Sequence, residues 1–218
     1  MRTMGIGRWA LAAFGAVLMI SGSAQAQGFR GGGFGMGGYA LLSNKSVQQE
    51  LKLSDDQAEK ATKVVEEALA KSRAKSQDLS PEDRRGEKGA EIRRAASDEI
   101  KAGVKDLLKT EQTKRLDQIV LQQRGLQAFT DPEIQSKLNL TDDQKSKIKD
   151  LAESNRSQMT EIFQNAQGDR QAAMQKMTAL RKETQEKTLA ILTDSQKKTW
   201  KELTGEPFEV KFEPRPNA

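Results

Sequence analysis

Apolar residues recur at steps of three and four along three long stretches of the chain, with polar residues at most positions between them. This spacing is typical of amphipathic α-helices that each bury one apolar stripe. The stripes comprise Ala58, Ala61, Val64, Val65, Ala68 and Leu69, then Ile148, Leu151, Ala152, Met159, Ile162 and Phe163, and finally Ala173, Met174, Met177, Leu180 and Ile191. Strict alternation and β-branched runs are rare between residues 46 and 204, so the pattern predicts an all-α fold.

The predicted stripes are narrow and rich in alanine, and aromatic residues make up only 5% of the chain. Helices of this kind bury too little apolar surface to fill a thick globular core. We therefore expect a thin, elongated or cradle-like layer of helices. Pro81 and Pro132 suit helix starts, and Gly125 and Gly205 suit helix ends.

A seven-residue phrase occurs in two nearly identical copies, as LKLSDDQ from position 51 and as LNLTDDQ from position 138. The hydroxyl of Ser54 or Thr141 suits the N-cap of a helix, where it accepts a hydrogen bond from a backbone N–H of the first turn. Gln57 and Gln144, three residues later, complete a capping box, and the aspartates between them favour the positive end of the helix dipole. The phrase therefore predicts a helix start, and we ascribe no further chemistry to it.

The last five residues of the phrase recur, as LKTEQ at 108–112 and LTDSQ at 192–196, although Lys109 replaces the capping hydroxyl in the first. The leucines that begin the paired motifs are 55 and 52 residues apart. We therefore expect two tandem helical units, 46–125 and 126–205, followed by an extended tail over 206–218. The motif residues are Leu53, Ser54, Gln57, Leu108, Gln112, Leu140, Thr141, Gln144, Leu192, Thr193 and Gln196.

The first 26 residues have the pattern of a secretory signal peptide. Arg2 and Arg8 precede a 12-residue apolar run, and small residues follow up to Ala26, after which we expect cleavage. Residues 27–45 begin with many glycines and predict a flexible leader. The mature protein is thus expected in the periplasm or outside the cell, with no stable membrane insertion.

Two absences from the composition narrow the possible functions. The chain has no cysteine, which excludes disulfides, and no histidine, which excludes a Ser-His-Asp triad and histidine-containing metal sites. Removal of Arg2 and Arg8 with the signal leaves 34 basic and 31 acidic residues, a mild excess that demands no nucleic-acid partner. We expect no metal site and no cofactor.

An exported, cysteine-free helical chain with paired L-T-x-x-Q motifs about 50 residues apart resembles the Spy/CpxP family of periplasmic LTxxQ-motif proteins. The resemblance covers residues 46–205. The resemblance implies a thin, cradle-shaped helical dimer. Members of that family act as ATP-independent chaperones or as stress-signalling accessories. Two units in one chain instead of one suggest a monomeric pseudo-dimer, with a homodimer as the alternative.

The resemblance implies a chaperone-like protein that binds unfolded or stress-damaged envelope proteins on a helical surface. The residues that we expect to contact such clients are Met159, Ile162, Phe163, Met174 and Met177. The alternatives are a signalling accessory that binds a sensor domain and a passive helical interaction protein. We do not expect an enzyme, because adjacent acidic residues diverge on a helix and cannot flank one bond.

Overall fold

The computed structural model describes residues 38–165 and 169–211, and these residues form helices with no strand among them. The all-α prediction is confirmed. In chain order the elements are η1 (Gly38–Ser43), α1 (Lys45–Glu50), α2 (Asp55–Gln77), α3 (Pro81–Arg85), α4 (Glu87–Gly103), α5 (Thr110–Arg124), η2 (Gly125–Thr130), α6 (Pro132–Lys137), α7 (Asp142–Gln164), α8 (Arg170–Ile191) and α9 (Asp194–Thr204). The predicted signal peptide and its cleavage after Ala26 lie outside the described residues.

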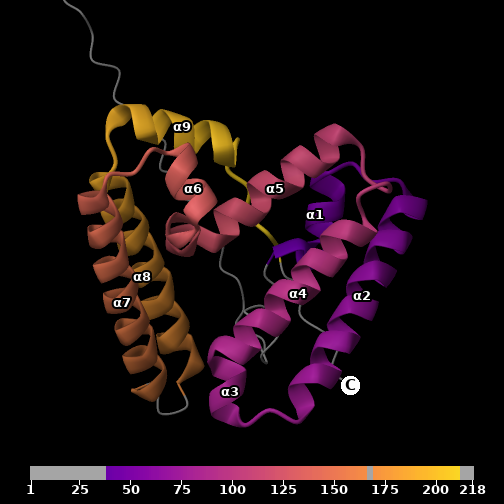
Figure 1. Ribbon diagram of the computed structural model, residues 1–218, viewed down its shortest axis with the longest axis horizontal. Coiled ribbons are helices and arrows are strands. Elements are labelled where there is room, and N and C mark those ends of the chain that lie inside the picture. Colours follow the sequence, from indigo (N-terminus) through magenta and orange to yellow (C-terminus); the bar gives the residue numbers. More distant parts are fainter. Residues whose placement is uncertain (1–37, 166–168, 212–218) are drawn as a thin grey trace, which may run out of the picture.

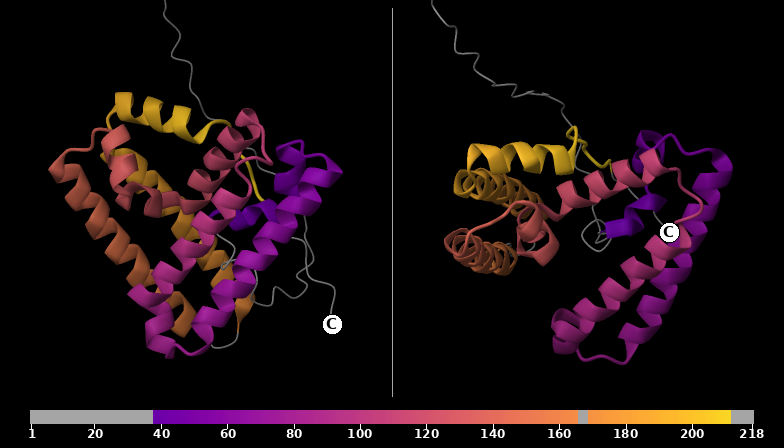
Figure 2. Two further views of the ribbon diagram at one scale, coloured as in Figure 1. Left: turned by 45° about the vertical axis from the view of Figure 1, so that its right-hand side comes forward. Right: turned by 45° about the horizontal axis from the view of Figure 1, so that its top comes forward.

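Two helical arms extend from a central hub, which is formed by η1, α1, α5, η2, α6 and α9. The first arm pairs α2 with α4, against which α3 also packs, and the second arm pairs α7 with α8. Figure 1 shows these arms on opposite sides of the molecule, with α5 and α9 across the top, so that the outline is triangular. Figure 2 shows the same two arms from two further directions.

The hub contains two hydrophobic cores that meet on α5. Leu116 and Ile119 of α5 are fully buried in the first core, with η1, α1 and the first arm. Leu121 faces the second core, which is built from η2, α6, the start of α7 and the end of α8. The ring centroids of Phe129 and Trp200 lie 4.2 Å apart and bring α9 against this second core.

The prediction of a flexible leader over residues 27–45 is wrong for its last eight residues. Residues 38–43 form η1, in which Leu41 and Leu42 are buried in the first core. The glycine-rich composition ends at Gly38, and the apolar sequence YALL that follows has enough side-chain surface to be buried. The first core therefore includes residues that the sequence assigned to the leader.

Helix boundaries agree with the sequence signals. Pro81 and Pro132 occupy the first turns of α3 and α6. Gly125 and Gly205 follow α5 and α9 with φ angles of 52° and 65°, a region that L-residues with a side chain rarely adopt. The chain can therefore reverse abruptly after each of these helices.

Candidate functional site

The four motifs each start a helix. Thr141 accepts a hydrogen bond from the backbone N–H of Gln144 at 3.2 Å, and Gln144 Oε1 accepts one from the N–H of Thr141 at 3.0 Å. The same two bonds form the capping boxes that begin α2 and α9. The capping prediction is therefore confirmed for the three motifs that have a hydroxyl at the N-cap position.

The fourth motif caps its helix only in part. Lys109 makes no side-chain cap hydrogen bond, because an ammonium group has no acceptor. Gln112 Oε1 still accepts a hydrogen bond from the backbone N–H of Lys109 at 2.9 Å. The glutamine half of the box thus persists where the hydroxyl half is lost.

The glutamines also join the motifs in pairs, which our assignment of no further chemistry to the phrase missed. Gln144 Nε2 donates to the carbonyl of Ile191 at 2.8 Å and to Gln196 Oε1 at 2.7 Å. In return, Gln196 Nε2 donates to the carbonyl of Asn139 at 3.3 Å. Each glutamine therefore caps its own helix with its oxygen and binds the partner motif with its nitrogen.

The same arrangement occurs in the first half of the chain. Gln57 Nε2 donates to the carbonyl of Leu107 at 2.7 Å and to Gln112 Oε1 at 3.0 Å, while Gln112 Nε2 donates to the carbonyl of Leu51 at 3.2 Å. Gln112 and Gln144 are buried, so these bonds are shielded from water. The 55- and 52-residue spacings were the sequence signal for this pairing, since each spans one arm and returns to its base.

The turns that precede the two full phrases also match. Lys52 and Asn139 have φ angles of 50° and 49°. The N–H groups of Leu53 and Leu140, one residue later, donate to carbonyls five positions earlier, at 3.0 Å in both cases. These turns end α1 and α6 and deliver each leucine to the base of an arm.

The residues predicted to contact clients are divided between the surface and the interior of the second arm. Phe163 is 57% exposed and Met174 is 42% exposed, and they are the exposed large hydrophobic side chains among the described residues. Met159 and Ile162 are half-buried. Met177 is only 2% exposed, so the prediction that it binds clients at the surface is wrong.

Phe163 and Met174 lie near the free end of the second arm, close to the last residue of α7 and the first turns of α8. Met177 is one turn further along α8 and is buried. The seam between these helices is partly polar, because Asn155 Nδ2 donates to the buried Thr184 Oγ1 at 2.6 Å. The second arm therefore carries exposed apolar groups at its tip and a polar contact along its length.

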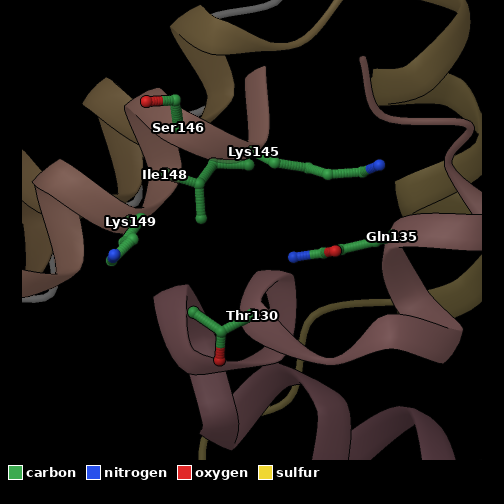
Figure 3. A pocket seen from close by; sticks show the side chains of 6 residues that line it. All are labelled: Thr130, Gln135, Lys145, Ser146, Ile148 and Lys149. Carbon is green, nitrogen blue, oxygen red and sulfur yellow. The ribbon is translucent and has the colours of Figure 1, made fainter. Parts of the chain in front are cut away.

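An open depression of about 450 Å³ lies between η2, α6 and the start of α7. Figure 3 shows Gln135 pointing into it and Lys149 pointing away. Lys145 pairs with Asp142 at 2.9 Å, and this hydrogen bond lowers the pKa of the Asp142 carboxyl. The other lining residues are Thr130, Ser146 and Ile148, which provide no pair of acid and base.

Charged groups elsewhere in the described part of the chain do not form a metal centre. Within residues 38–165 and 169–211, no group of three acidic side chains is placed to hold a metal ion. No helix in the same residues is both long and apolar enough to span a bilayer. Most ion pairs join exposed residues one helical turn apart, such as Lys60 with Asp56, and leave the arm surfaces mixed in charge.

Comparison with known families gives one match. A model described as "LTXXQ motif family protein" matches residues 126–204, which run from η2 to the end of α9. The matched segment contains the second glutamine pair and both exposed apolar side chains of the second arm. No curated protein and no solved structure matches the chain.

Proposed function

We propose, from the match of residues 126–204 to the LTXXQ motif family model, that the chain is an exported chaperone-like protein that binds unfolded polypeptides without ATP. That family includes Spy/CpxP-like proteins, which are helical and typically periplasmic. The observation that carries the proposal is the exposure of Phe163 and Met174 at the tip of a thin helical arm. Exposed apolar side chains that gather on one surface are a feature of interaction sites, whereas single ones are common on any protein surface.

Phe163 and Met174 suit a variable ligand. Methionine is unbranched and adapts its shape to different partners, and phenylalanine contributes a large apolar face. The surrounding arm is rich in charged residues of both signs, which would keep a complex with an unfolded polypeptide soluble. The same features give no preference for one client sequence.

We further propose that residues 38–125 and 126–205 are two tandem units that together form a monomeric pseudo-dimer. The lengths of matching elements support this, since α2 and α7 have 23 residues each and α1 and α6 have six each. The two glutamine pairs and the turns at Lys52 and Asn139 support it as well. The mass of residues 27–218 by light scattering tests this proposal, because a stable homodimer contradicts it.

The function is tested with residues 27–218 and a reduced, aggregating model protein in the absence of ATP. We expect delayed aggregation at equimolar ratio, and several-fold less protection from the double variant Phe163→Ser with Met174→Ser. The matched control is Gln164→Ser with Gln171→Ser, which changes two exposed polar residues at the same end of the arm. Equal protection by both double variants contradicts a client surface at the arm tip.

The family match also accommodates a signalling accessory of the CpxP type. That function predicts no protection against aggregation and a single folded partner recovered at fixed stoichiometry from an envelope extract. A chain that neither protects nor recovers a partner would be a passive helical protein. We propose no catalytic activity and no cofactor for any of these functions.

A further inference from the structure

The chain does not leave the molecule after α9. Gly205 turns it back, and residues 206–211, which we call the strap, pass α5 toward η1 and α1 (yellow beyond α9 in Figure 1). The strap begins where the second half of the chain ends, yet it packs on the first core. This segment is the described part of the tail expected over 206–218, and its docking was not predicted.

The strap is held through its backbone. Gln122 Nε2 donates to the carbonyls of Thr204 and Glu206 at 2.6 and 2.8 Å, and Gln122 Oε1 accepts from the N–H of Phe208 at 2.9 Å. Arg115 also donates to the carbonyl of Glu206, at 2.9 Å. Two side chains of α5 thus bind the first half of the strap without contacting a polar side chain in it.

The far end of the strap is held in the same way. Asn44 Nδ2 donates to the carbonyl of Lys211 at 2.8 Å, and the N–H of Lys211 donates to Ser46 Oγ at 3.0 Å. Hydrogen bonds to backbone atoms are available to any polypeptide in the same extended conformation, whatever its side chains. Proline at the positions of Phe208 and Lys211 is the exception, because it lacks the N–H.

Two apolar side chains supply the remaining contacts. Val210 is 7% exposed and belongs to the first core, and Phe208 packs against that core beneath the Arg115 guanidinium, 6.0 Å from the ring centroid. Glu209 between them is exposed. Side chains two residues apart point the same way in an extended chain, so the surface under the strap accepts an apolar–X–apolar segment.

We infer that the surface formed by Asn44, Ser46, Arg115 and Gln122, which we call the strap groove, is a binding site for an extended segment of an unfolded polypeptide. The ligand carries two apolar side chains separated by one residue. An unfolded chain presents free backbone N–H and C=O groups beside such side chains, whereas a folded protein has paired them. The inference rests on the proposed function for the kind of ligand, and it concerns a site separate from the arm tip.

The strap acts at this site as a built-in competitor. A segment tethered by a short linker has an effective concentration of about a millimolar, so a free peptide of micromolar affinity displaces it only in part. Release of the strap therefore exposes the groove and raises its apparent affinity for other segments. The second half of the chain controls a site on the first half by this means.

The first experiment compares full-length mature protein with its Phe208→Ser, Val210→Ser variant, in which the strap loses its apolar contacts. The probe is a fluorescein-labelled peptide, EPFEVK, and binding is measured by anisotropy. We expect at least ~10-fold tighter binding to the variant than to the wild type, since the tethered competitor is removed. The peptide EPSESK, without the apolar pair, should bind neither. Equal affinity of EPFEVK for both proteins would overturn the inference.

A second experiment fixes the strap in the groove with a disulfide and compares the oxidised and reduced forms of one protein. Ser46→Cys with Lys211→Cys places a thiol pair where Ser46 Oγ and the backbone nitrogen of Lys211 are 3.0 Å apart, in a chain with no other cysteine. We expect the oxidised form to bind EPFEVK at least ~10-fold more weakly than the reduced form of the same protein. Unchanged binding on oxidation contradicts the inference even if the serine variant is unfolded.

Two measurements distinguish this inference from client binding at the arm tip and from binding of the tail of a second copy. Aggregation assays with the Phe163 and Met174 variants report on the arm tip, whereas peptide anisotropy reports on the groove, so either can fail alone. A wild-type dimer that dissociates on addition of EPFEVK would assign the groove to the tail of a second copy. That result would overturn the assignment to an unfolded polypeptide.

Discussion

Gln144 and Gln196 donate to each other across 52 residues of sequence: Gln144 Nε2 lies 2.7 Å from Gln196 Oε1, and Gln196 Nε2 lies 2.9 Å from Gln144 Oε1. Each oxygen also accepts a backbone N–H at its own helix start. The base of the second arm is thereby closed by one pair of amides. The first arm is closed in the same way by Gln57 and Gln112.

Replacing Gln144 with alanine should therefore weaken both a helix start and the arm base. We expect a loss of about 2 kcal/mol in the free energy of unfolding, because a cap is removed and buried backbone groups lose a partner. Urea unfolding followed by circular dichroism measures the change. Gln164→Ala, at the exposed end of the same helix, should stay within about 0.5 kcal/mol of wild type.

Gln144→Glu separates the two roles of this side chain. A carboxylate still accepts the N–H of Thr141 and suits the first turn of a helix, but it cannot donate to Ile191 or Gln196. We expect this variant to lose about 1 kcal/mol or more relative to wild type. Stability equal to wild type would show that the bonds across the arm base contribute nothing.

Lys52 is a position where a substitution should raise the free energy of unfolding. Its φ of 50° costs a residue with a side chain about 1 kcal/mol, and Asn139 at the equivalent turn tolerates this region better. Lys52→Gly should raise the free energy of unfolding by about 0.5 kcal/mol, after allowance for the flexibility of glycine in the unfolded chain. Lys52→Ala keeps the positive φ and should bring no gain. A gain from alanine as large as that from glycine would assign the effect to the lysine charge.

The sequence was most informative where structure depends on neighbours along the chain. Caps at Ser54, Thr141 and Thr193 were predicted because their partners are three residues away. The pairing of Gln144 with Gln196 was not, since it requires knowing that α8 returns to the base of α7. The side-chain amide of each glutamine reaches its partners in the other motif only when the arm is folded.

The burial of individual residues in the apolar stripes could also not be predicted from the sequence. Met174 and Met177 are three positions apart on one face of α8, and periodicity treats them alike. Met177 is buried, whereas Met174 lies closer to the end of the arm, where α7 stops. The docking of Val210 in the first core was missed for a related reason, because an extended segment of six residues is too short to show a periodic pattern of apolar positions.

Tyr39 offers a direct test of the docking of η1. Burial, and then a hydrogen bond from its hydroxyl to Asp117, raise the pKa of this phenol well above its ordinary value of about 10. Tyr39 is the single tyrosine of the chain, so its ionisation can be followed by absorbance near 295 nm without interference from others. We expect a midpoint above pH 10 in the folded protein and a return to about 10 in urea.

The same shift links stability to pH. The folded protein holds the phenol proton more tightly than the unfolded chain, so this contribution to stability is complete below about pH 10 and is lost progressively as the pH rises toward the folded pKa. Tyr39→Phe should be less stable than wild type at pH 8, and the gap should narrow above pH 10. A gap that stays constant across this range would contradict the linkage.

Gly205 and Gly125 form a matched pair that tests how the strap is directed. Both have positive φ, but a Cβ on Gly205 would lie 2.4 Å from Gln118 Oε1, whereas a Cβ on Gly125 meets nothing within 4 Å. Alanine at either position should cost about 1–3 kcal/mol through backbone strain, and Gly205→Ala should cost more because Gln118 must also move. Only Gly205→Ala should alter the strap, so we expect it alone to increase the binding of EPFEVK. Equal effects of the two substitutions on peptide binding would mean that the turn at Gly205 does not position the strap.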